Sequence, residues 1–245
     1  MKDYNLLAQT IYKRKSVRTF IKKSIGIKKD TNILEAFNIE PLVKDIKVNI
    51  KLLKKEEIWN TWSNYCFAFY SEDKPYHLEN IGFIGQQLDL TLQSKGIGSC
   101  WWGLKKPKSK FKKSEGLDCI ITMAAGIPQN PEIRNYPESF NRKSPKDIVI
   151  GDTNPDDLIK AVSIAPSAMN MQPWLIEKNG GKYSFYLRNP INFIERMATW
   201  MRNVDMGIAL AHFYIQAKAD GHTVSFGFEG NDINQGKFIA DINIS

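Results

Sequence analysis

Three cations and a hydroxyl occur within five residues near the start of the chain, in Arg14, Lys15, Ser16, Val17 and Arg18. Guanidinium groups bind phosphate through paired hydrogen bonds, and a serine hydroxyl adds a further donor. This combination suits the binding of a phosphate together with a second electron-rich group. Taken alone, the same segment is also typical of a basic surface loop.

A second candidate segment runs from 165 to 174 and reads APSAMNMQPW. It contains two prolines, a serine, two amides and a tryptophan, and it directly follows a predicted helix. The amides of Asn170 and Gln172 offer donors and acceptors together, which suits the alternating edge of a heteroaromatic ring. This composition is unusual for a plain connection, so the segment predicts a binding loop.

A third candidate segment, GIGSCWWG at 96–103, combines glycines with the neighbouring indoles of Trp101 and Trp102. Glycine lets a ligand approach the backbone closely, and indoles supply a flat apolar surface. The spacing does not match the GxGxxG pattern of dinucleotide sites, and the segment follows a predicted helix rather than a strand. The sequence therefore indicates a loop that contacts a ligand without a dinucleotide motif.

Other kinds of catalytic and metal site find little support. The three cysteines, Cys66, Cys100 and Cys119, have neither disulfide-framework nor CxxC spacing, so we expect reduced, buried thiols. The three histidines form no HxxxH or HxxEH pattern, and we expect no protein-built metal site. No Ser-His-Asp, Cys-His or paired-carboxylate arrangement is recognisable, so no side chain is expected to be an obligatory catalytic acid or base.

Composition limits the class of protein. The 245 residues are 42% hydrophobic and 24% charged, which excludes disordered, collagenous and coiled-coil proteins. Apolar runs fall short of the ~18 residues of a membrane span and the start lacks a signal-peptide core, so we expect a cytoplasmic protein without membrane contact. The net charge of +8 favours anionic partners. Lysines concentrate at 13–29 and at 105–113, and we expect the second stretch to be a solvated loop.

A comparison of the chain with itself indicates an internal duplication. At an offset of 125 residues the aligned landmarks are 34–42 with 159–167, Gly82 with Gly207, and Gly96 with Gly221. Landmarks in one order at one offset predict two related halves, residues 1–145 and 146–245.

The predicted elements repeat in the two halves as well: a short helix, a break at proline, a strand and a long helix that ends at glycine. The predicted helices are 32–39, 77–95, 154–164 and 201–220, and the predicted strands are 48–53, 65–70, 119–127, 182–187 and 222–228. Their irregular alternation predicts an α+β fold. Both long helices are nearly apolar all round, so we expect them to be buried and to pack on each other at an internal pseudo-twofold axis.

Together, the motifs resemble the nitroreductase family of flavin enzymes. RKSVRTF is similar to that family's opening arginine-rich motif, APSAMNMQPW to its loop after a helix, and KGIGSCWWG to its helix-end motif before the flavin face. AAGIP followed by FNRKSPKDIV is similar to its closing segment. The resemblance covers most of the chain and implies a nitroreductase-like α+β fold that binds FMN.

The order of these motifs departs from that of ordinary family members. There the APS–N–QPW loop comes soon after the arginine-rich motif, whereas here it lies beyond the closing segment, in the second half. Ordinary members resemble one another in being homodimers that share the flavin between subunits. The resemblance therefore implies that the two halves replace two subunits, so that one chain is a monomeric pseudo-dimer with one complete site. The reciprocal site, at Pro41 to Asp45, is expected to be empty.

The resemblance also assigns roles to first-half residues. The residues implied to hold the FMN phosphate are Arg14, Ser16, Arg142 and Lys143. Lys15 and Arg18 would lie along the ribityl chain and the N1–O2 edge of the flavin, where a cation stabilises the reduced form.

The remaining implied contacts concern the flavin ring. Asn170 and Gln172 would reach the pyrimidine edge or the ribityl hydroxyls, while Pro166 and Ser167 would cover the ring. The residues implied to lie near the dimethylbenzene ring and N5 are Trp101, Trp102 and Gly103.

The implied activity is that of an oxidoreductase. NAD(P)H would deliver a hydride to the flavin N5, and a small planar acceptor such as a nitroaromatic or a quinone would then receive it. Two alternatives remain open at this point. One is a flavin-binding protein of the same fold with little or no turnover. The other is a nucleic-acid-binding module that uses the lysine-rich stretches, although the neighbouring tryptophans lie in the flavin motif and not among the lysines.

Overall fold

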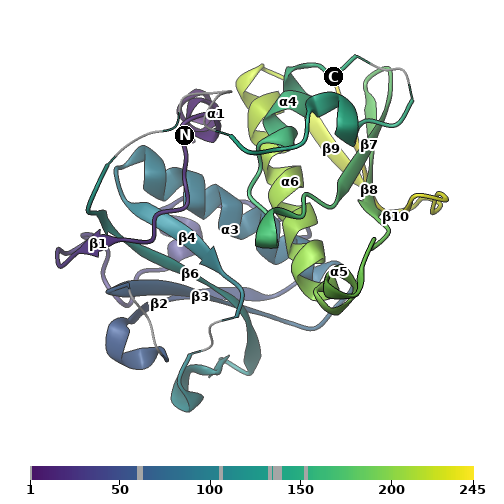
Figure 1. Ribbon diagram of the computed structural model, residues 1–245. Helices are drawn as coiled ribbons and strands as arrows, with labels where there is room; N and C mark the ends of the chain where they lie inside the picture. Colours follow the sequence, from purple (N-terminus) through teal and green to yellow (C-terminus); the bar gives the residue numbers. More distant parts are fainter. Residues whose placement is uncertain (1, 60–62, 105–106, 132–133, 135–139, 152–153) are drawn as a thin grey trace.

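The computed structural model describes residues 2–59, 63–104, 107–131, 134, 140–151 and 154–245. Two long helices, α3 (His77–Ser94) and α6 (Thr199–Ala219), lie side by side in the middle of the molecule (Figure 1). Helix α3 packs on one antiparallel sheet and α6 on another. The predicted α+β class is confirmed. Within the described residues, no helix has both the length and the apolar character that crossing a membrane requires.

The first sheet takes its strands from the first half of the chain. Strands β2 (Val48–Lys54), β3 (Tyr65–Ser71), β6 (Leu117–Pro128) and β4 (Gly98–Trp102) are antiparallel in the order β2-β3-β6-β4. The short strands β1 (Phe20–Ile21) and β5 (Lys113–Ser114) pair with the two ends of β6. Strand β3 is buried from Cys66 onward because α3 covers one face of the sheet and a small cluster around Tyr70 covers the other. Burial on both faces explains its continuous apolar run.

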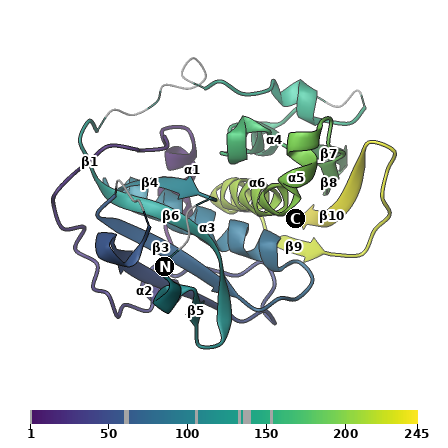
Figure 2. The same cartoon turned by 60° about the horizontal axis from the view of Figure 1, so that its bottom comes forward.

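The second sheet comes from the second half and repeats this arrangement. Strands β7 (Trp174–Asn179), β8 (Lys182–Arg188), β10 (Gly236–Ile244) and β9 (Val224–Gly227) are antiparallel in the order β7-β8-β10-β9. Figure 2 views α6 nearly along its axis, with this sheet beside it. In both sheets a hairpin comes first, the long helix follows, and the last two strands join in reverse order. This shared topology supports the predicted duplication.

The two long helices touch through their backbones at a pair of glycines. A Cβ atom on Gly82 would lie 2.0 Å from the carbonyl oxygen of Val204, and one on Gly207 would lie 1.9 Å from the carbonyl oxygen of Glu79. The two contacts are reciprocal, because each residue of one contact is 125 positions from its counterpart in the other. Such reciprocity is the property of a twofold interface, and here it occurs within one chain.

Both long helices also end in the same way. Gly96 and Gly221, aligned at the same offset, follow the helices with positive φ values of 74° and 88°. In each case the amide of the next residue donates to a carbonyl of the last turn at 2.9 Å. Glycine adopts this left-handed conformation without a steric cost, so the two stops follow from the sequence.

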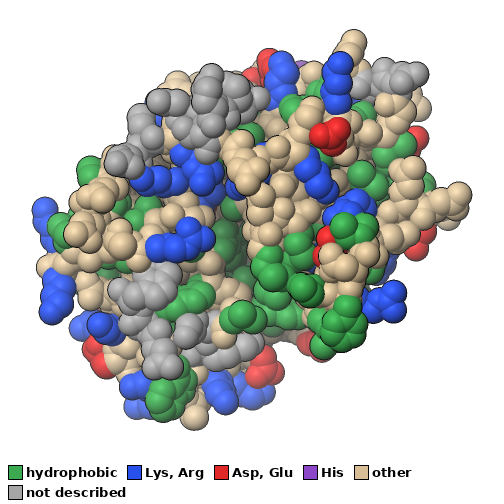
Figure 3. Space-filling model, in the orientation of Figure 1, with side chains coloured by type: hydrophobic (Ala, Val, Ile, Leu, Met, Phe, Trp, Pro, Cys, Tyr) green, Lys and Arg blue, Asp and Glu red, His purple; other side chains and the backbone are tan. Residues whose placement is uncertain are grey.

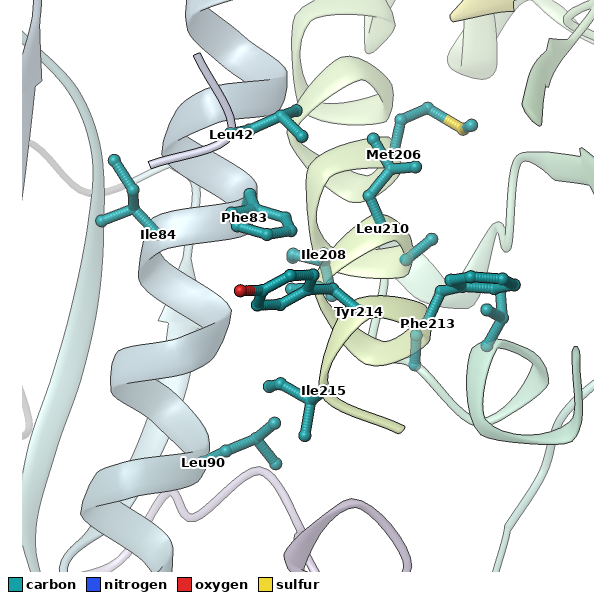
Figure 4. Close-up of a cluster of buried hydrophobic side chains, with 14 of the residues drawn as sticks. Leu42, Phe83, Ile84, Leu90, Met206, Ile208, Leu210, Phe213, Tyr214 and Ile215 are labelled. Atoms are coloured by element: carbon teal, nitrogen blue, oxygen red, sulfur yellow. The ribbon is translucent and has the colours of Figure 1, made fainter. Parts of the chain in front are cut away.

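A continuous hydrophobic core surrounds the helix pair, as Figure 4 shows. Phe83 of α3 and Tyr214 of α6 face each other with ring centroids 5.3 Å apart. On the other side of α6, Phe213 contacts Tyr183 and Phe185 of the second sheet at 4.7 and 5.6 Å. The burial expected for the long helices is therefore confirmed.

The four predicted helices and five predicted strands are all present with shifted ends. The two short helices among them are α2 (Ile33–Ala36) and α4 (Asp157–Ser163). Two short helices, α1 (Tyr4–Ile11) and α5 (Phe193–Met197), and the strands β7 and β10 were not predicted. The loop predicted at 96–103 is wrong, because Gly98–Trp102 forms β4 and pairs with the interior of β6.

The lysine-rich stretch at 105–113 differs from the predicted loop in part. Ser109–Phe111 forms a 3-10 turn and Lys113 begins β5, while the lysines from 108 to 113 are exposed or half-buried. Residues 105 and 106 lie outside the described residues.

Candidate functional site

The arginine-rich segment runs beside strand β4. The amide of Val17 donates to the carbonyl of Ser99 at 2.9 Å, and Ser16 and Ser99 form a parallel bridge. Ser16 and Arg18 face a cavity next to β4. Arg14 is only 2% exposed and its Nε lies 2.8 Å from Oδ2 of the buried Asp89.

The cavity beside this segment is lined by both halves of the chain. It encloses about 140 Å³ between the arginine-rich segment, strand β4, the 165–174 loop and helix α6. The lining residues that the sequence had singled out are Ser16, Arg18, Trp101, Gly103, Pro166 and Ser167. The structure thus brings together three motifs that are far apart in the sequence.

The 165–174 loop has an unusual backbone. Met169, Asn170 and Gln172 have φ values of 49°, 59° and 48°, in the left-handed region that residues other than glycine rarely occupy. The loop is held by its own contacts: the amide of Ala168 donates to both carboxylate oxygens of Asp205 at 3.0 and 3.1 Å, and the amide of Gln172 donates to Ser167 Oγ at 2.9 Å. Backbone strain that is fixed in this way concentrates at functional sites.

The closing segment of the first half binds this loop directly. Arg142 donates from Nη1 to Asn170 Oδ1 at 2.7 Å and from Nε to the carbonyl of Ala165 at 3.1 Å. The amide of Lys143 donates to Gln172 Oε1 at 2.7 Å, and its Nζ donates to the Gln172 carbonyl at 3.2 Å. Asn170 and Gln172 therefore contact the closing segment. Neither lines the cavity, and their implied contacts with the flavin stay predictions.

Four arginines lie close enough to repel one another. Burial and the positive charges of Arg14 and Arg134 lower the pKa of Arg142 to about 10. Burial and the charges of Arg14 and Arg18 likewise lower the pKa of Arg134. Arg14 Nη2 and Arg134 Nη1 are buried and have no hydrogen-bond partner among the described residues. Since buried donors are normally paired, this cluster fits an anion.

Arg134 was missed by the sequence analysis. It lies between the AAGIP and FNRKS parts of the closing motif, and its amide donates to the carbonyl of Lys13 at 3.1 Å. Its place in an irregular segment gives no periodic signal. Its position between two parts of a recognised motif was the available indication.

A buried polar network fixes the residues behind the cavity. Gln86 Nε2 donates to Asp89 Oδ2 at 3.1 Å, and Gln86 Oε1 accepts from Trp101 Nε1 at 3.0 Å. His212 Nδ1 lies 2.9 Å from the carbonyl of Ala161, so it carries the proton while Nε2 accepts from Gln86. Burial lowers the pKa of His212 to about 3, which keeps the ring neutral. The network orients both the arginine side chain and the indole.

The other predicted site residues lie around this arrangement. Lys15 lines a second hollow of about 250 Å³ together with Arg14. Trp102 is partly buried in β4, where its carbonyl accepts from Thr122 Oγ1 at 3.0 Å, and it does not line the cavity.

The cysteines are free, as predicted: Cys66 and Cys100 are buried, whereas Cys119 is half-buried. Burial raises the pKa of the Cys100 thiol, so the thiol in the cavity wall stays protonated.

Comparison with known proteins identifies the family. A family model described as "Putative TM nitroreductase" matches residues 6–217 of the chain. The chain belongs to this nitroreductase family. A putative nitroreductase from Thermotoga maritima MSB8 has a similar structure, with a TM-score of 0.65 and 20% sequence identity, over 97% of this chain and 93% of that one. An FMN-dependent nitroreductase from Clostridium difficile R20291 is similar over 59% of this chain and 98% of its own, with a TM-score of 0.46 and 14% identity.

No curated protein sequence matches the chain. Family membership confirms the nitroreductase-like fold that the motifs predicted and supports an oxidoreductase function.

Proposed function

We propose that this member of the nitroreductase family is an FMN-dependent oxidoreductase. It would pass a hydride from NAD(P)H to a small planar acceptor such as a nitroaromatic or a quinone. One observation carries the proposal: Ser16 and Arg18 of the first half line the same cavity as Pro166 and Ser167 of the second. The FMN dependence of a nitroreductase with a similar sheet-and-helix arrangement agrees with this choice of cofactor.

The arginine cluster fits the phosphate of FMN. The buried Nη2 of Arg14 and Nη1 of Arg134 have no partner among the described residues, and a phosphate would supply acceptors for both. It would also offset the repulsion that lowers the pKa of Arg142. We infer that the phosphate is held by Arg14, Ser16, Arg134, Arg142 and Lys143.

The wall of the cavity would orient and shield the flavin ring. The indole of Trp101 is fixed by stacking on Phe69, with ring centroids 5.6 Å apart, and by its hydrogen bond to Gln86. Pro166 and Ser167 would cover the ring, and Arg18 would place a positive charge at the N1–O2 edge. Bound FMN supplies N5, which accepts a hydride from NAD(P)H and passes it to the second substrate.

The side chains of the cavity have little acid or base chemistry to offer. Among the described residues that line it, the titratable side chains are Arg18, Cys100 and Asp205. Burial keeps the Cys100 thiol protonated and also favours the protonated form of Asp205, whose two oxygens are held by the amide of Ala168. We therefore expect these residues to bind and orient, with no obligatory general acid or base.

We further infer that the two halves, 1–145 and 146–245, stand in for the two subunits of a homodimer. The shared strand order of the two sheets and the reciprocal contacts of Gly82 and Gly207 support this inference. A single chain would then hold a complete site and act as a monomer.

The test is an anaerobic titration of the FMN-loaded protein with NADH and with NADPH. We expect the absorbance of oxidised flavin, at about 450 nm, to disappear. It should return when a quinone is added. Bound FMN that stays oxidised with both nucleotides would contradict the proposed turnover and indicate a flavin-binding protein of the same fold.

A further inference from the structure

Exposed apolar side chains cover helix α5. This α5 patch consists of Ile191, Phe193, Ile194 and Met197, each between 62% and 74% exposed. Figure 3 shows hydrophobic side chains gathered over α5 and the start of α6, beside the hollow between the two halves. An exposed apolar patch of this kind commonly marks a binding site.

The exposure follows from the way α5 is anchored. Its inward side chain is Glu195, which is 5% exposed and lies 3.2 Å from Arg188 Nη2 and 3.7 Å from Arg202 Nη2. Asn192 caps the helix, because its Oδ1 accepts from the amide of Glu195 at 2.9 Å. A surface helix normally buries its apolar face and exposes its charges. In α5 the Glu195 carboxylate is buried and paired, whereas the apolar side chains face solvent.

The patch is continuous with the cavity. Helix α5 ends at Met197, and Met201 lies in the first turn of α6, which begins after Ala198. Met201 lines the cavity, as do Val204 and Ile208 further along α6. An apolar stripe in the sequence, Ile194, Met197, Met201 and Val204, therefore joins the exposed patch to residues of the cavity wall.

The opposite rim of the cavity is apolar as well. Met169, which lines the cavity, is 63% exposed, and Leu104, which follows the cavity residue Gly103, is 80% exposed. A Cβ atom on Gly103, the residue after β4, would lie 3.0 Å from Met201 Sδ, so the end of β4 and the start of α6 are in contact. Methionine side chains adapt to ligands of different shape.

We propose that the α5 patch binds the aliphatic chain of an electron acceptor whose planar head lies in the cavity. The proposal rests on the proposed function and names its acceptor class: a planar quinone-like compound with an apolar chain. The continuity of the stripe with the cavity favours one ligand that occupies both. A separate partner would have no reason to cover a surface that extends to the flavin.

The experiment compares two benzoquinones with the same methoxy-substituted head, one carrying a decyl chain and one without it. Their binding to FMN-loaded protein is measured by calorimetry without nucleotide, so that no turnover occurs. Each methylene that leaves water strengthens binding roughly fourfold. With only part of the chain in contact, we expect the decyl compound to bind about thirtyfold more tightly.

The double variant Ile194→Gln with Met197→Gln tests the surface itself. It should reduce the preference for the decyl compound to less than about fivefold, because the chain would then lie against polar amides. Flavin absorbance reports whether the variant is folded. The matched control is Ile21→Gln, an exposed isoleucine in the edge strand β1, which should keep the preference.

Several results would overturn the proposal. These are equal affinities of the wild-type protein for the two quinones, or a preference that survives the double variant. Concentration-dependent dimers that the double variant abolishes, with no change in preference, would assign the patch to a second copy of the chain. The preference for the decyl compound is measured without reductant. It is therefore independent of the NADH titration that tests the proposed function.

Discussion

Two loops of the molecule, 41–45 and 166–170, are held by the same device. The amides of Leu42 and Val43 donate to Asn80 Oδ1 of α3 at 2.8 and 3.0 Å. The amide of Ala168 donates to Asp205 of α6 at 3.0 and 3.1 Å. Asn80 and Asp205 are 125 positions apart, as are Val43 and Ala168.

The side chains of the two loops differ although their anchors agree. Leu42 is buried in the core beside the long helices, whereas its counterpart Ser167 caps the amide of Gln172 and lines the cavity. Asp45 is exposed, whereas its counterpart Asn170 binds Arg142 across the two halves. The anchoring of a loop on a long helix is therefore present twice, whereas the groups suited to bind a ligand are present in only one of the two loops.

The largest expected effect concerns the scaffold that both halves share. Gly82→Ala and Gly207→Ala should each destabilise the fold by at least about 3 kcal/mol, because the new methyl would meet a carbonyl oxygen of the neighbouring helix. The measurement is urea unfolding. Gly227→Ala is the control, since its nearest neighbour would lie 3.8 Å from the Cβ. If one of the two substitutions were tolerated and the other were not, the two helices would not be equivalent.

The second prediction uses the difference between the two anchors. Burial raises the pKa of Asp205 from 3.8 to about 8. Between these values the folded state binds more protons than the unfolded state, so the free energy of unfolding falls as the pH rises. Asp205→Asn keeps an acceptor for Ala168 and should remove this slope, leaving the variant more stable than the wild type near the upper value.

The reverse exchange sharpens this test. Asn80→Asp places a carboxyl at the counterpart position, which is fully buried, and should add a second pH-dependent loss of stability. Urea unfolding of both variants at about pH 5 and about pH 8 measures the two slopes. If the free energy of unfolding of Asp205→Asn and of the wild type changed in parallel with pH, Asp205 would not be the group that titrates.

The smallest expected effect concerns the ligand. Asn170→Ala should weaken FMN binding about tenfold, because it removes a hydrogen bond to the charged Arg142 and lets the phosphate clamp relax. Its counterpart Asp45→Ala should leave FMN affinity as it is. Quenching of FMN fluorescence during titration measures both. Equal effects of the two substitutions would mean that the 41–45 loop also contributes to a flavin site.

The elements that the sequence predicted well are those with a strong period. The long helices carry apolar residues at helical spacing and end at Gly96 and Gly221, and the buried strands are rich in β-branched and aromatic residues. Strand β4 was taken for a loop because its glycine and serine resemble a turn, whereas pairing with the interior of β6 decides its conformation. Helix α5 was not predicted because Glu195 lies inside and its apolar residues lie outside, the reverse of the usual amphipathic pattern.

The segments that form the candidate site could be predicted from their motifs, but the contacts between them could not. Six of the residues chosen from the sequence line one cavity, because local composition marks segments that bind ligands. Asp205 lies within the apolar long helix, and only the packing of the 165–174 loop on that helix gives it a role. The pairing of Asn170 with Arg142 depends on the meeting of two irregular segments, which no periodic pattern records.

The most direct test of the shared site is the amount of flavin that one chain binds. The protein is saturated with FMN, freed of excess by gel filtration, and assayed for flavin absorbance and for mass by light scattering. We expect one FMN per chain and a particle of one chain. Two FMN per chain would mean that the 41–45 loop also forms a site, and no retained FMN would contradict the proposed cofactor.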